Sequence, residues 1–311
     1  MSRPLAAATD RAGATRFDVV GFGFNTHDHV CVVASPPGID SKQGLRAYAQ
    51  MPGGQVPTAL VALQRWGLRT AYVGPFGDDG GGRDQYAALA AEGIDLSGSV
   101  TRAGVASQTA FILVDQVTGE RTVLWTRPAA LPLRADELDG AALSAGRALL
   151  LDADDADSAI LAARLAKDAG ALVMLDVDEP DPRTDELLAL TDAVIVAAHL
   201  PRRLTGLADL GAALRQIATR GPWLAAATLG AGGALACARG RMLYVPPFRV
   251  VALDSTSAGD LFHAGCLYGL LQNWPVERAL RFASAAAALA CTVVGGRASV
   301  PALNRVLELA S

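Results

Sequence analysis

Residues 254–271 read DSTSAGDLFHAGCLYGLL, a run of small and polar residues that leads directly into an apolar helix. Ser257, Ala258 and Gly259 have little or no side chain, so their backbone N–H groups can approach a ligand closely. The N-terminus of a helix carries unpaired N–H donors and a partial positive charge. The stretch therefore predicts a site for a phosphate, or for a developing phosphoryl charge, where this helix begins.

Asp260 adds a carboxylate at the same helix start. A carboxylate weakens simple phosphate binding, but it suits a group that holds and deprotonates a hydroxyl which attacks a phosphate. The alternative is an Asp that only caps an ordinary helix, which is a common role for this residue type. The stretch alone leaves both interpretations open.

The composition bounds the classes of protein that fit. The chain has 311 residues, of which 51% are hydrophobic and 19% charged, with a formal net charge of −4. This size suits one large α/β domain with a sizeable core. No basic stripe is visible, so we expect no nucleic-acid partner. The most lipid-like run, residues 283–296, is too short to span a bilayer, so we expect no membrane partner either.

The ends and the cysteines indicate a location. Residues 1–16 lack the apolar segment of a secretory signal, and we expect a flexible N-terminal tail there, followed by one α/β domain over 17–311. The four cysteines lie far apart, in apolar runs and without metal-ligand spacing: Cys31, Cys237, Cys266 and Cys291. Reduced thiols in a cytoplasmic protein are the expected interpretation.

Apolar strand segments alternate with helical segments along most of the chain. Strands are expected at 17–24, 70–77, 148–154, 171–178, 192–198 and 223–230, and helices at 57–67, 83–93, 157–170, 184–190, 207–220, 258–272 and 276–293. Continuous apolar strands suit a sheet that is buried on both faces. The order predicts an α/β fold with a doubly wound, mostly parallel sheet flanked by helices.

Two segments, at about 28–50 and 107–127, interrupt this alternation and predict a small antiparallel flap that closes as a lid over a ligand. The second contains two strands around the turn at 117–120. Ala110 to Val114 are apolar without alternation, so we expect both faces of that strand to be covered. Substrate would cover one face, and a second subunit the other, which predicts a homodimer through the lid sheet.

Polar and small residues near the start of the chain suit a sugar. Asn25 and Asp28 follow the first strand, where α/β sheets bind ligands, and they supply donors and acceptors for hydroxyls. Gly53 and Gly54 open a helix and let backbone approach a ligand, with Gln55 beside them. Ordinary turn chemistry explains these residue types equally well.

Later strand ends suggest a nucleotide site. The segment Thr228-Leu229-Gly230-Ala231-Gly232-Gly233 leaves room for phosphates and ribose, although a plain glycine turn is the simpler interpretation. Acidic residues that end two strands could approach phosphates or a magnesium shell, or they could merely form loops: Asp152, Asp176 and Asp178. The chain contains neither GxGxxG nor GxxxxGK[ST], which argues against a Rossmann or P-loop site.

Together, these segments resemble the PfkB/ribokinase family of carbohydrate kinases. Residues 53–82 (GGQVPTALVALQRWGLRTAYVGPFGDDGGG) match its first signature, residues 254–269 match its second, and TLGAGG at 228–233 matches its nucleotide loop. The match covers about residues 17–305. It implies a ribokinase-like fold and an ATP-dependent transfer of phosphate to a hydroxyl of a small sugar or sugar derivative.

The resemblance also implies roles for residues. Asp260 would be the catalytic base, and the backbone of Ser257, Ala258, Gly259 and Asp260 would form the anion hole. The sugar would be held by Asp28, Asn25, Gly53, Gly54 and Gln55, and ATP by Thr228, Gly230 and Gly233. Mg²⁺ would accompany ATP. A monovalent cation such as K⁺ would lie at Asp254 and Thr256.

The sequence departs from the family pattern at four positions. Ser257 stands where Gly is usual, and Gln55 where Asn is frequent. The family's NxxE motif, which orders Mg²⁺ through water, falls on Ala197 and Leu200. This loss keeps open a catalytically weakened relative that binds sugar or regulates. A nucleoside kinase of the same family is a further alternative.

Overall fold

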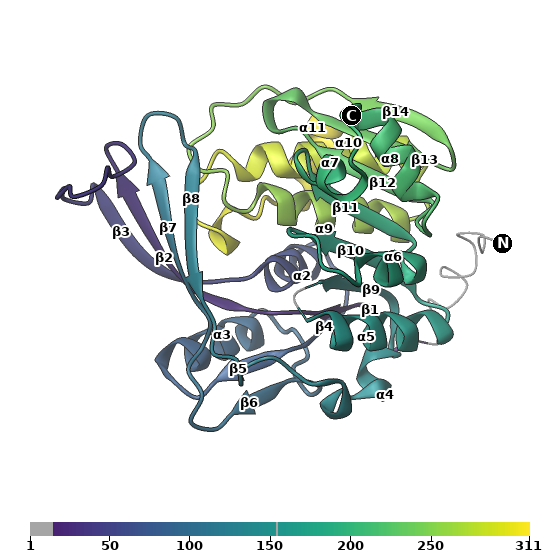
Figure 1. Ribbon diagram of the computed structural model, residues 1–311, viewed down its shortest axis with the longest axis horizontal. Helices are drawn as coiled ribbons and strands as arrows, with labels where there is room; N and C mark the ends of the chain where they lie inside the picture. Colours follow the sequence, from purple (N-terminus) through teal and green to yellow (C-terminus); the bar gives the residue numbers. More distant parts are fainter. Residues whose placement is uncertain (1–14, 154) are drawn as a thin grey trace.

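The computed structural model describes residues 15–153 and 155–311, so most of the predicted N-terminal tail lies outside the described residues. A central sheet has the strand order β14-β13-β12-β11-β10-β9-β1-β4 (Figure 1). Its strands are β1 (Phe17–Phe22), β4 (Thr70–Val73), β9 (Gly146–Asp152), β10 (Leu172–Val177), β11 (Ala193–Ala197), β12 (Leu224–Thr228), β13 (Ala234–Ala238) and β14 (Arg241–Val245). Among the described strands of this sheet, β13 pairs antiparallel with β12 and β14, and the other neighbours pair in parallel.

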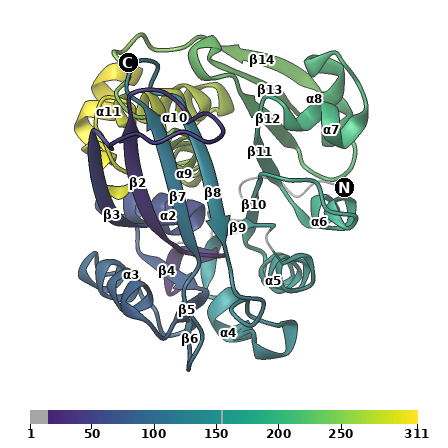
Figure 2. The ribbon, with the colours of Figure 1, turned by 60° about the vertical axis from the view of Figure 1, so that its left-hand side comes forward.

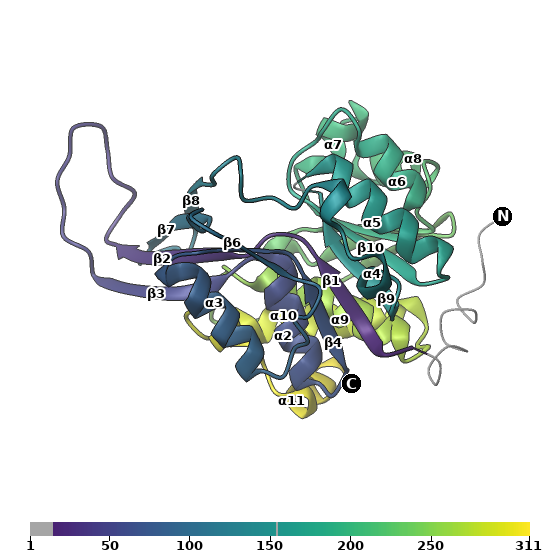
Figure 3. The same cartoon turned by 90° about the horizontal axis from the view of Figure 1, so that it is seen from below.

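Helices cover both faces of this sheet (Figure 3). One face packs against α2 (Gln55–Arg65), α9 (Ala258–Leu271), α10 (Val276–Ala290) and α11 (Leu303–Ala310). The other face packs against α4 (Gly140–Leu143), α5 (Ala156–Asp168), α6 (Thr184–Leu190), α7 (Leu200–Thr205) and α8 (Leu210–Ala218). Successive strand residues enter opposite cores: Val19 joins the first and Val20 the second. The predicted doubly wound, mostly parallel fold is confirmed.

A second sheet stands beside the body as a lid, with the order β3-β2-β7-β8 (Figures 1 and 2). Its strands are β2 (Thr26–Val33), β3 (Ala47–Gly53), β7 (Thr109–Asp115) and β8 (Arg121–Thr126). The outer pairings are antiparallel, whereas β2 and β7 pair in parallel. Helix α3 (Gly80–Ala91) and the short pair β5 (Pro75–Gly77) and β6 (Val100–Arg102) lie at its base.

The two faces of the strand β7 differ in burial within the single chain, and the expectation that a second subunit covers the outer face of Ala110 to Val114 stays a prediction. Ala110, Ile112 and Val114 are buried, but Phe111 keeps 46% of its surface exposed. Successive side chains of a strand point to opposite faces, so one face of the lid is packed while the other is open in the single chain.

Helix boundaries differ from the predictions where caps decide them. The segment expected as one helix over 207–220 begins at Leu210, because the Asp209 carboxylate accepts a hydrogen bond from Ala212 N at 2.6 Å. Helix α7 was missed, although its sequence carries the usual signals. Pro201 lies in its first turn, and Gly206 ends it with φ 75°.

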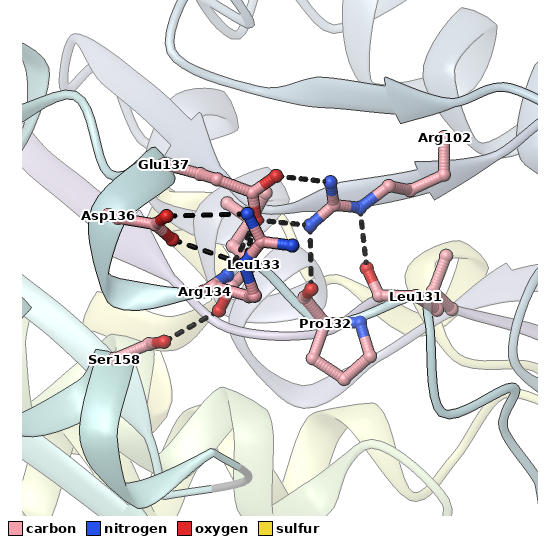
Figure 4. A network of polar contacts seen from close by, with 8 residues as sticks. All are labelled: Arg102, Leu131, Pro132, Leu133, Arg134, Asp136, Glu137 and Ser158. Carbon is pink, nitrogen blue, oxygen red and sulfur yellow. Dashed lines mark hydrogen bonds and ion pairs between the residues drawn. The ribbon is translucent and has the colours of Figure 1, made fainter.

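One arginine fixes the chain where it returns from the lid to β9 (Figure 4). Arg102 donates to Leu131 O at 3.3 Å and to Pro132 O at 2.7 Å, and it forms a two-pronged ion pair with Glu137 at 2.5 and 2.6 Å. Ser158 donates from α5 to Leu133 O at 2.6 Å. This polar clip ties the returning segment to β6 and α5.

In the part of the chain that the structure describes, none of the helices is both long enough and apolar enough to cross a membrane.

Candidate active site

The first turn of α9 presents free backbone donors. Ser257 is the N-cap residue, but its hydroxyl bonds to the Ser299 hydroxyl at 2.5 Å and leaves the helix start uncapped by a side chain. Among the described residues, no protein acceptor is found for the N–H groups of Gly259 and Asp260. A Cβ on Gly259 would meet no atom within 4 Å, so open space lies above this turn. The arrangement suits an anion.

Asp260 lies in this first turn and keeps part of its surface open. Burial of the carboxyl group raises its pKa well above the usual value, and the negative charge of Asp176 raises it further. The positive charge of Arg121 acts in the opposite direction. A carboxylate with a raised pKa is a stronger base, which suits proton removal from a hydroxyl near neutral pH.

His263 fixes the position of that turn. Its Nδ1 lies 2.9 Å from Gly259 O, one turn earlier in α9. Its Nε2 lies 3.1 Å from Ile195 O of β11 and 3.5 Å from the carboxylate of Asp176, which is in β10. The histidine therefore ties the helix start to two strands of the central sheet. Sequence reasoning missed it, although a lone His inside an apolar helix was a visible signal.

Asp28 faces the same region from the lid. It is 7% exposed, and its Oδ1 has no hydrogen-bond partner among the described residues. Burial raises its pKa to about 7, against the lowering effects of the Thr26 hydroxyl and Arg297. A Cβ on Gly53 would overlap the carboxylate of Asp28, so only glycine permits this approach. An unpaired buried acceptor is costly without a ligand, and a hydroxyl would satisfy it.

Arg297 is a second residue that sequence reasoning missed. It is 7% exposed and donates to Gly53 O at 2.8 Å, while its Nε and Nη1 have no partner among the described residues. Burial lowers its pKa to about 10, and nearby negative groups, Asp28 and Asp260 among them, oppose this. The buried guanidinium thus supplies positive charge close to both carboxylates. Its position after two glycines gave no signal that distinguishes it from an ordinary loop arginine.

The early loop residues divide between two tasks. Asn25 donates both amide hydrogens within the protein, to the Tyr72 hydroxyl at 2.9 Å and to Pro75 O at 2.6 Å, so its NH₂ group fixes the turn after β1. Gln55 donates to the Asp178 carboxylate at 2.7 Å and stays partly exposed. Gly54 has φ 98°, a conformation that favours glycine. The structure thus brings Asp28, Gly53 and Gln55 to the region that Asp260 faces.

Thr228 and the glycines after it lie at the carboxyl end of β12. Thr228 pairs in register with Ala197 of β11. Gly230 has φ 55° and open space around its Cβ position, whereas a Cβ on Gly233 would overlap Val245 O. Gly233 is therefore required by the backbone alone. Leu200 is fully buried, so this position provides no polar group near Thr228.

The acidic strand ends supply negative charge without forming a metal cage. Burial raises the pKa of Asp176 to about 6 and that of Asp152 well above its usual value. Among residues 15–153 and 155–311, no group of three or more His, Cys, Asp or Glu side chains is arranged to hold a metal ion. This donor set fits a Mg²⁺ that arrives with phosphate oxygens and water as its main ligands.

Asp254 ties the loop before α9 to the segment before Arg297. Its Oδ1 accepts from Thr256 N at 2.9 Å and from the Thr256 hydroxyl at 2.5 Å. Its Oδ2 accepts from Gly295 N at 2.9 Å. The contacts hold two loops together around a buried carboxylate, and both oxygens of that carboxylate accept hydrogen bonds from the protein.

Comparisons with known proteins identify the family of the chain. The model of the pfkB family of carbohydrate kinases matches residues 31–303. A ribokinase from Haemophilus influenzae is 30% identical over 266 residues, which cover 82% of this chain and 86% of the relative. A fructokinase from Klebsiella pneumoniae is 32% identical over 278 residues, covering 81% and 89%.

The solved structures show the same fold. The crystal structure of a fructokinase from Xylella fastidiosa with bound ATP is 28% identical, with a TM-score of 0.80 over 94% of this chain and 97% of that one. A ribokinase from Thermotoga maritima, 23% identical, covers 94% and 99% with a TM-score of 0.79 and shows the fold alone. The chain therefore belongs to the pfkB family of carbohydrate kinases.

Proposed function

We propose that this ATP-dependent carbohydrate kinase transfers the γ-phosphoryl group of ATP to a hydroxyl of a small sugar or sugar derivative. The observation that carries the proposal is the first turn of α9, where the Asp260 carboxylate lies beside two free N–H groups. Asp28 and Gln55 would hold the sugar, with Gly53 and Gly54 giving it backbone access and Asn25 fixing the adjacent turn. Thr228, Gly230 and Gly233 would line the ATP site.

The proposed step needs little covalent chemistry from the protein. Asp260 accepts the hydroxyl proton, and the hydroxyl oxygen forms a bond to the γ-phosphorus while the bond to the β-phosphate oxygen breaks and ADP leaves. The backbone of Ser257, Ala258, Gly259 and Asp260 stabilises charge on the transferring group. Positioning provides most of the acceleration, and the lid limits wasteful hydrolysis by excluding water.

Metal ions have defined places in this proposal. Asp176 and Asp178 are the carboxylates that would contact the water shell of a Mg²⁺ in the absence of acids at Ala197 and Leu200, and that ion would neutralise phosphate charge. K⁺ would lie at Asp254 and Thr256. Activity in KCl that exceeds activity in NaCl at equal ionic strength tests the second assignment, and equal rates would refute it.

The central test is ADP release across a panel of sugars, with Asp260→Asn. We expect a fall in kcat of about 10²–10⁴-fold, which is the usual contribution of a positioned base. Asp168→Asn, an exposed change at the end of α5, is the matched control and should retain full activity. Full activity of Asp260→Asn would refute the mechanism. Tight sugar binding without turnover in the unmodified chain would favour the weakened, regulatory relative.

We also propose a homodimer through the lid and a cytoplasmic location. Tyr48, Phe111 and Leu124 are 52%, 46% and 56% exposed, and the strand register places them on the face opposite to Asp28. The four cysteines are free thiols, which suits a reducing compartment. Sedimentation that shows a monomer at micromolar concentration would refute the dimer, and cell fractionation tests the location.

A further inference from the structure

The side chain of Trp125 belongs to the face of the lid that is directed toward the body. On β8, Trp125 pairs with Ala110 of β7, and Ala110 pairs with Asp28 of β2. Paired residues of neighbouring strands place their side chains on the same face of a sheet. Trp125 therefore shares the face of Asp28, whose carboxylate lies close enough to Asp260 to affect its pKa. Figure 2 shows β8 at the edge of the lid, next to β7.

Two arginines near Trp125, Arg121 in β8 and Arg127 just after its end, support this direction. Arg121, four residues earlier, donates to Ser255 O at 2.5 Å, in the loop that leads into α9. Arg127, two residues later, places its guanidinium 5.6 Å from the centre of the Trp125 ring. Arg127 also lines a small cavity with Gly23 and Asp152, at the carboxyl ends of β1 and β9. Trp125 thus lies between two side chains that both reach the body.

Trp125 is nevertheless 61% exposed. On the same lid face, Val30 and Ile112 are only 2% and 4% exposed, and Val123 of β8 is 45% exposed, so the indole ring is the largest apolar group that stays uncovered there among the described residues. A Trp side chain offers a large planar surface with few rotatable bonds, and it stacks on sugar or base rings at little cost in entropy. Its exposure on an inward face indicates that a ligand covers it.

The distance between Trp125 and Asp28 indicates which part of a ligand would cover the indole ring. Asp28 and Trp125 are two strands apart, and neighbouring strands are about 4.8 Å apart, so their Cα atoms are separated by roughly 10 Å. A sugar held by Asp28 does not fill that distance with one ring. A second ring, attached to the sugar, would reach the indole.

We propose that Trp125 is a specificity-determining residue that stacks on a second, planar ring of the acceptor. The acceptor would be a sugar that carries an aromatic ring through a glycosidic bond, as a nucleoside or an aryl glycoside does. This inference rests on the proposed function, because it uses the acceptor site between Asp28 and Asp260. The acceptor is thereby narrowed from any small sugar to a sugar that carries an aromatic ring.

The test compares kcat/KM of the full chain for free D-ribose and D-fructose, for adenosine and uridine, and for phenyl ribofuranoside. Trp125→Ala should lower kcat/KM for the ring-bearing acceptors about 10- to 100-fold, which is the usual effect of losing one stacked ring. Free sugars should change by less than about twofold, and Trp125→Phe should restore part of the loss. The nucleosides and phenyl ribofuranoside are measured separately, and the comparison of their kcat/KM values shows whether the preferred ring is a nucleobase or a phenyl group.

The matched control is Val117→Ala, an apolar residue that is 85% exposed in the turn between β7 and β8. It should leave all acceptors unchanged. Equal losses for free sugars and ring-bearing acceptors, or no loss in Trp125→Ala, would overturn the inference while the kinase function stands.

Binding to the Asp260→Asn variant separates the inference from the proposed function. Calorimetry on this variant should show ring-bearing acceptors binding at least about tenfold more tightly than free sugars, and Trp125→Ala should remove that preference. Absence of the preference overturns the inference even if the chain phosphorylates sugars. A chain that binds these ligands without ever producing ADP would instead refute the proposed function.

Discussion

The first turn of α9 and the lid sheet face the same space, but they are built in opposite ways. The α9 turn works through backbone and small residues, and His263 and Asp254 hold it to the sheet and to the neighbouring loop. The lid works through side chains on its strands, and its edge strand β8 is largely exposed. In the function that we propose, the chemistry would therefore depend on a rigid helix start, and the choice of acceptor on a less enclosed surface.

The largest effect is expected from removing the charge of Asp28, which lies in the lid but is buried like a core residue. In the folded chain its pKa is about 7, against 3.8 for the ordinary group. The folded state therefore keeps a proton that the unfolded state releases, so stability falls as pH rises from about 4 to 7. Asp28→Asn cannot ionise, so it avoids this fall in stability. Each unit of pKa shift corresponds to about 1.4 kcal/mol of unfolding free energy.

At pH 8 we expect the free energy of unfolding of Asp28→Asn to exceed that of the unmodified chain by on the order of a few kcal/mol, so that it unfolds at a higher temperature, with little difference at pH 4. The same change should weaken sugar binding, because it removes the charged acceptor. Thermal unfolding at both pH values and calorimetry with sugar measure the two effects. Asp168→Asn should change neither. A stability gain that does not depend on pH would show that Asp28 is not held with a raised pKa.

Gly53→Ala moves the same carboxylate without changing its charge. The added Cβ would overlap the carboxylate of Asp28, so Asp28 or β3 must shift. A displacement of about 1 Å can cost about 100-fold in activity, and we expect kcat/KM for the sugar to fall by about 10- to 100-fold. Gly38→Ala is the control, because its Cβ would meet no atom within 4 Å. Unchanged kinetics in Gly53→Ala would mean that the sugar does not depend on Asp28.

The same contrast explains what the sequence could predict. The parallel sheet and the start of α9 were visible because apolar strands and a run of small residues at a helix start are local patterns. Resemblance to the family then gave Asp260 and Asp28 their expected tasks. Local pattern and motif order were sufficient for the fold class.

The contacts between distant segments could not be predicted in this way. Arg297 and Asp28 are separated by most of the chain, and only the folded structure brings both to Gly53. Trp125 required the strand register, because a shift by one residue would place it on the opposite face of the lid. Asn25 was expected to contact sugar, but the structure shows that its amide hydrogens hold the turn after β1.

Arg121 of the lid contacts the loop that leads into α9, so Arg121→Ala tests whether the lid affects the chemistry at α9. It donates to Ser255 O at 2.5 Å, and its charge favours the ionised form of Asp260. The contact is solvent-exposed, so we expect a loss of about tenfold in kcat/KM, near the lower end for hydrogen bonds from charged groups. Without this charge the pKa of Asp260 rises further, so the acid limb of the pH–rate profile should move to higher pH.

Arg121→Lys keeps the charge and should leave the acid limb in place while losing part of the rate. Arg46→Ala, an exposed change near the start of β3, is the control and should have no effect. Equal pH profiles for the Ala and Lys variants would show that Arg121 acts only as a mechanical contact.

The smallest expected effect lies where the lid strand returns to the body. Arg102→Ala removes the clip on Leu131, Pro132 and Glu137, which is far from the reacting groups (Figure 4). We expect a loss of about 1–2 kcal/mol in unfolding free energy and a fall of a few degrees in Tm, with kcat within about twofold. The Arg102 side chain lowers the pKa of Glu137 to about 2, so the stability difference should shrink as pH falls from about 4.5 toward 2. Arg134→Ala, whose side chain is 70% exposed, is the control and should change Tm less. If Arg102→Ala lowered kcat as much as Arg121→Ala, the returning segment would control closure of the lid, and the rigid part of the site would have to include the base of the lid as well as α9.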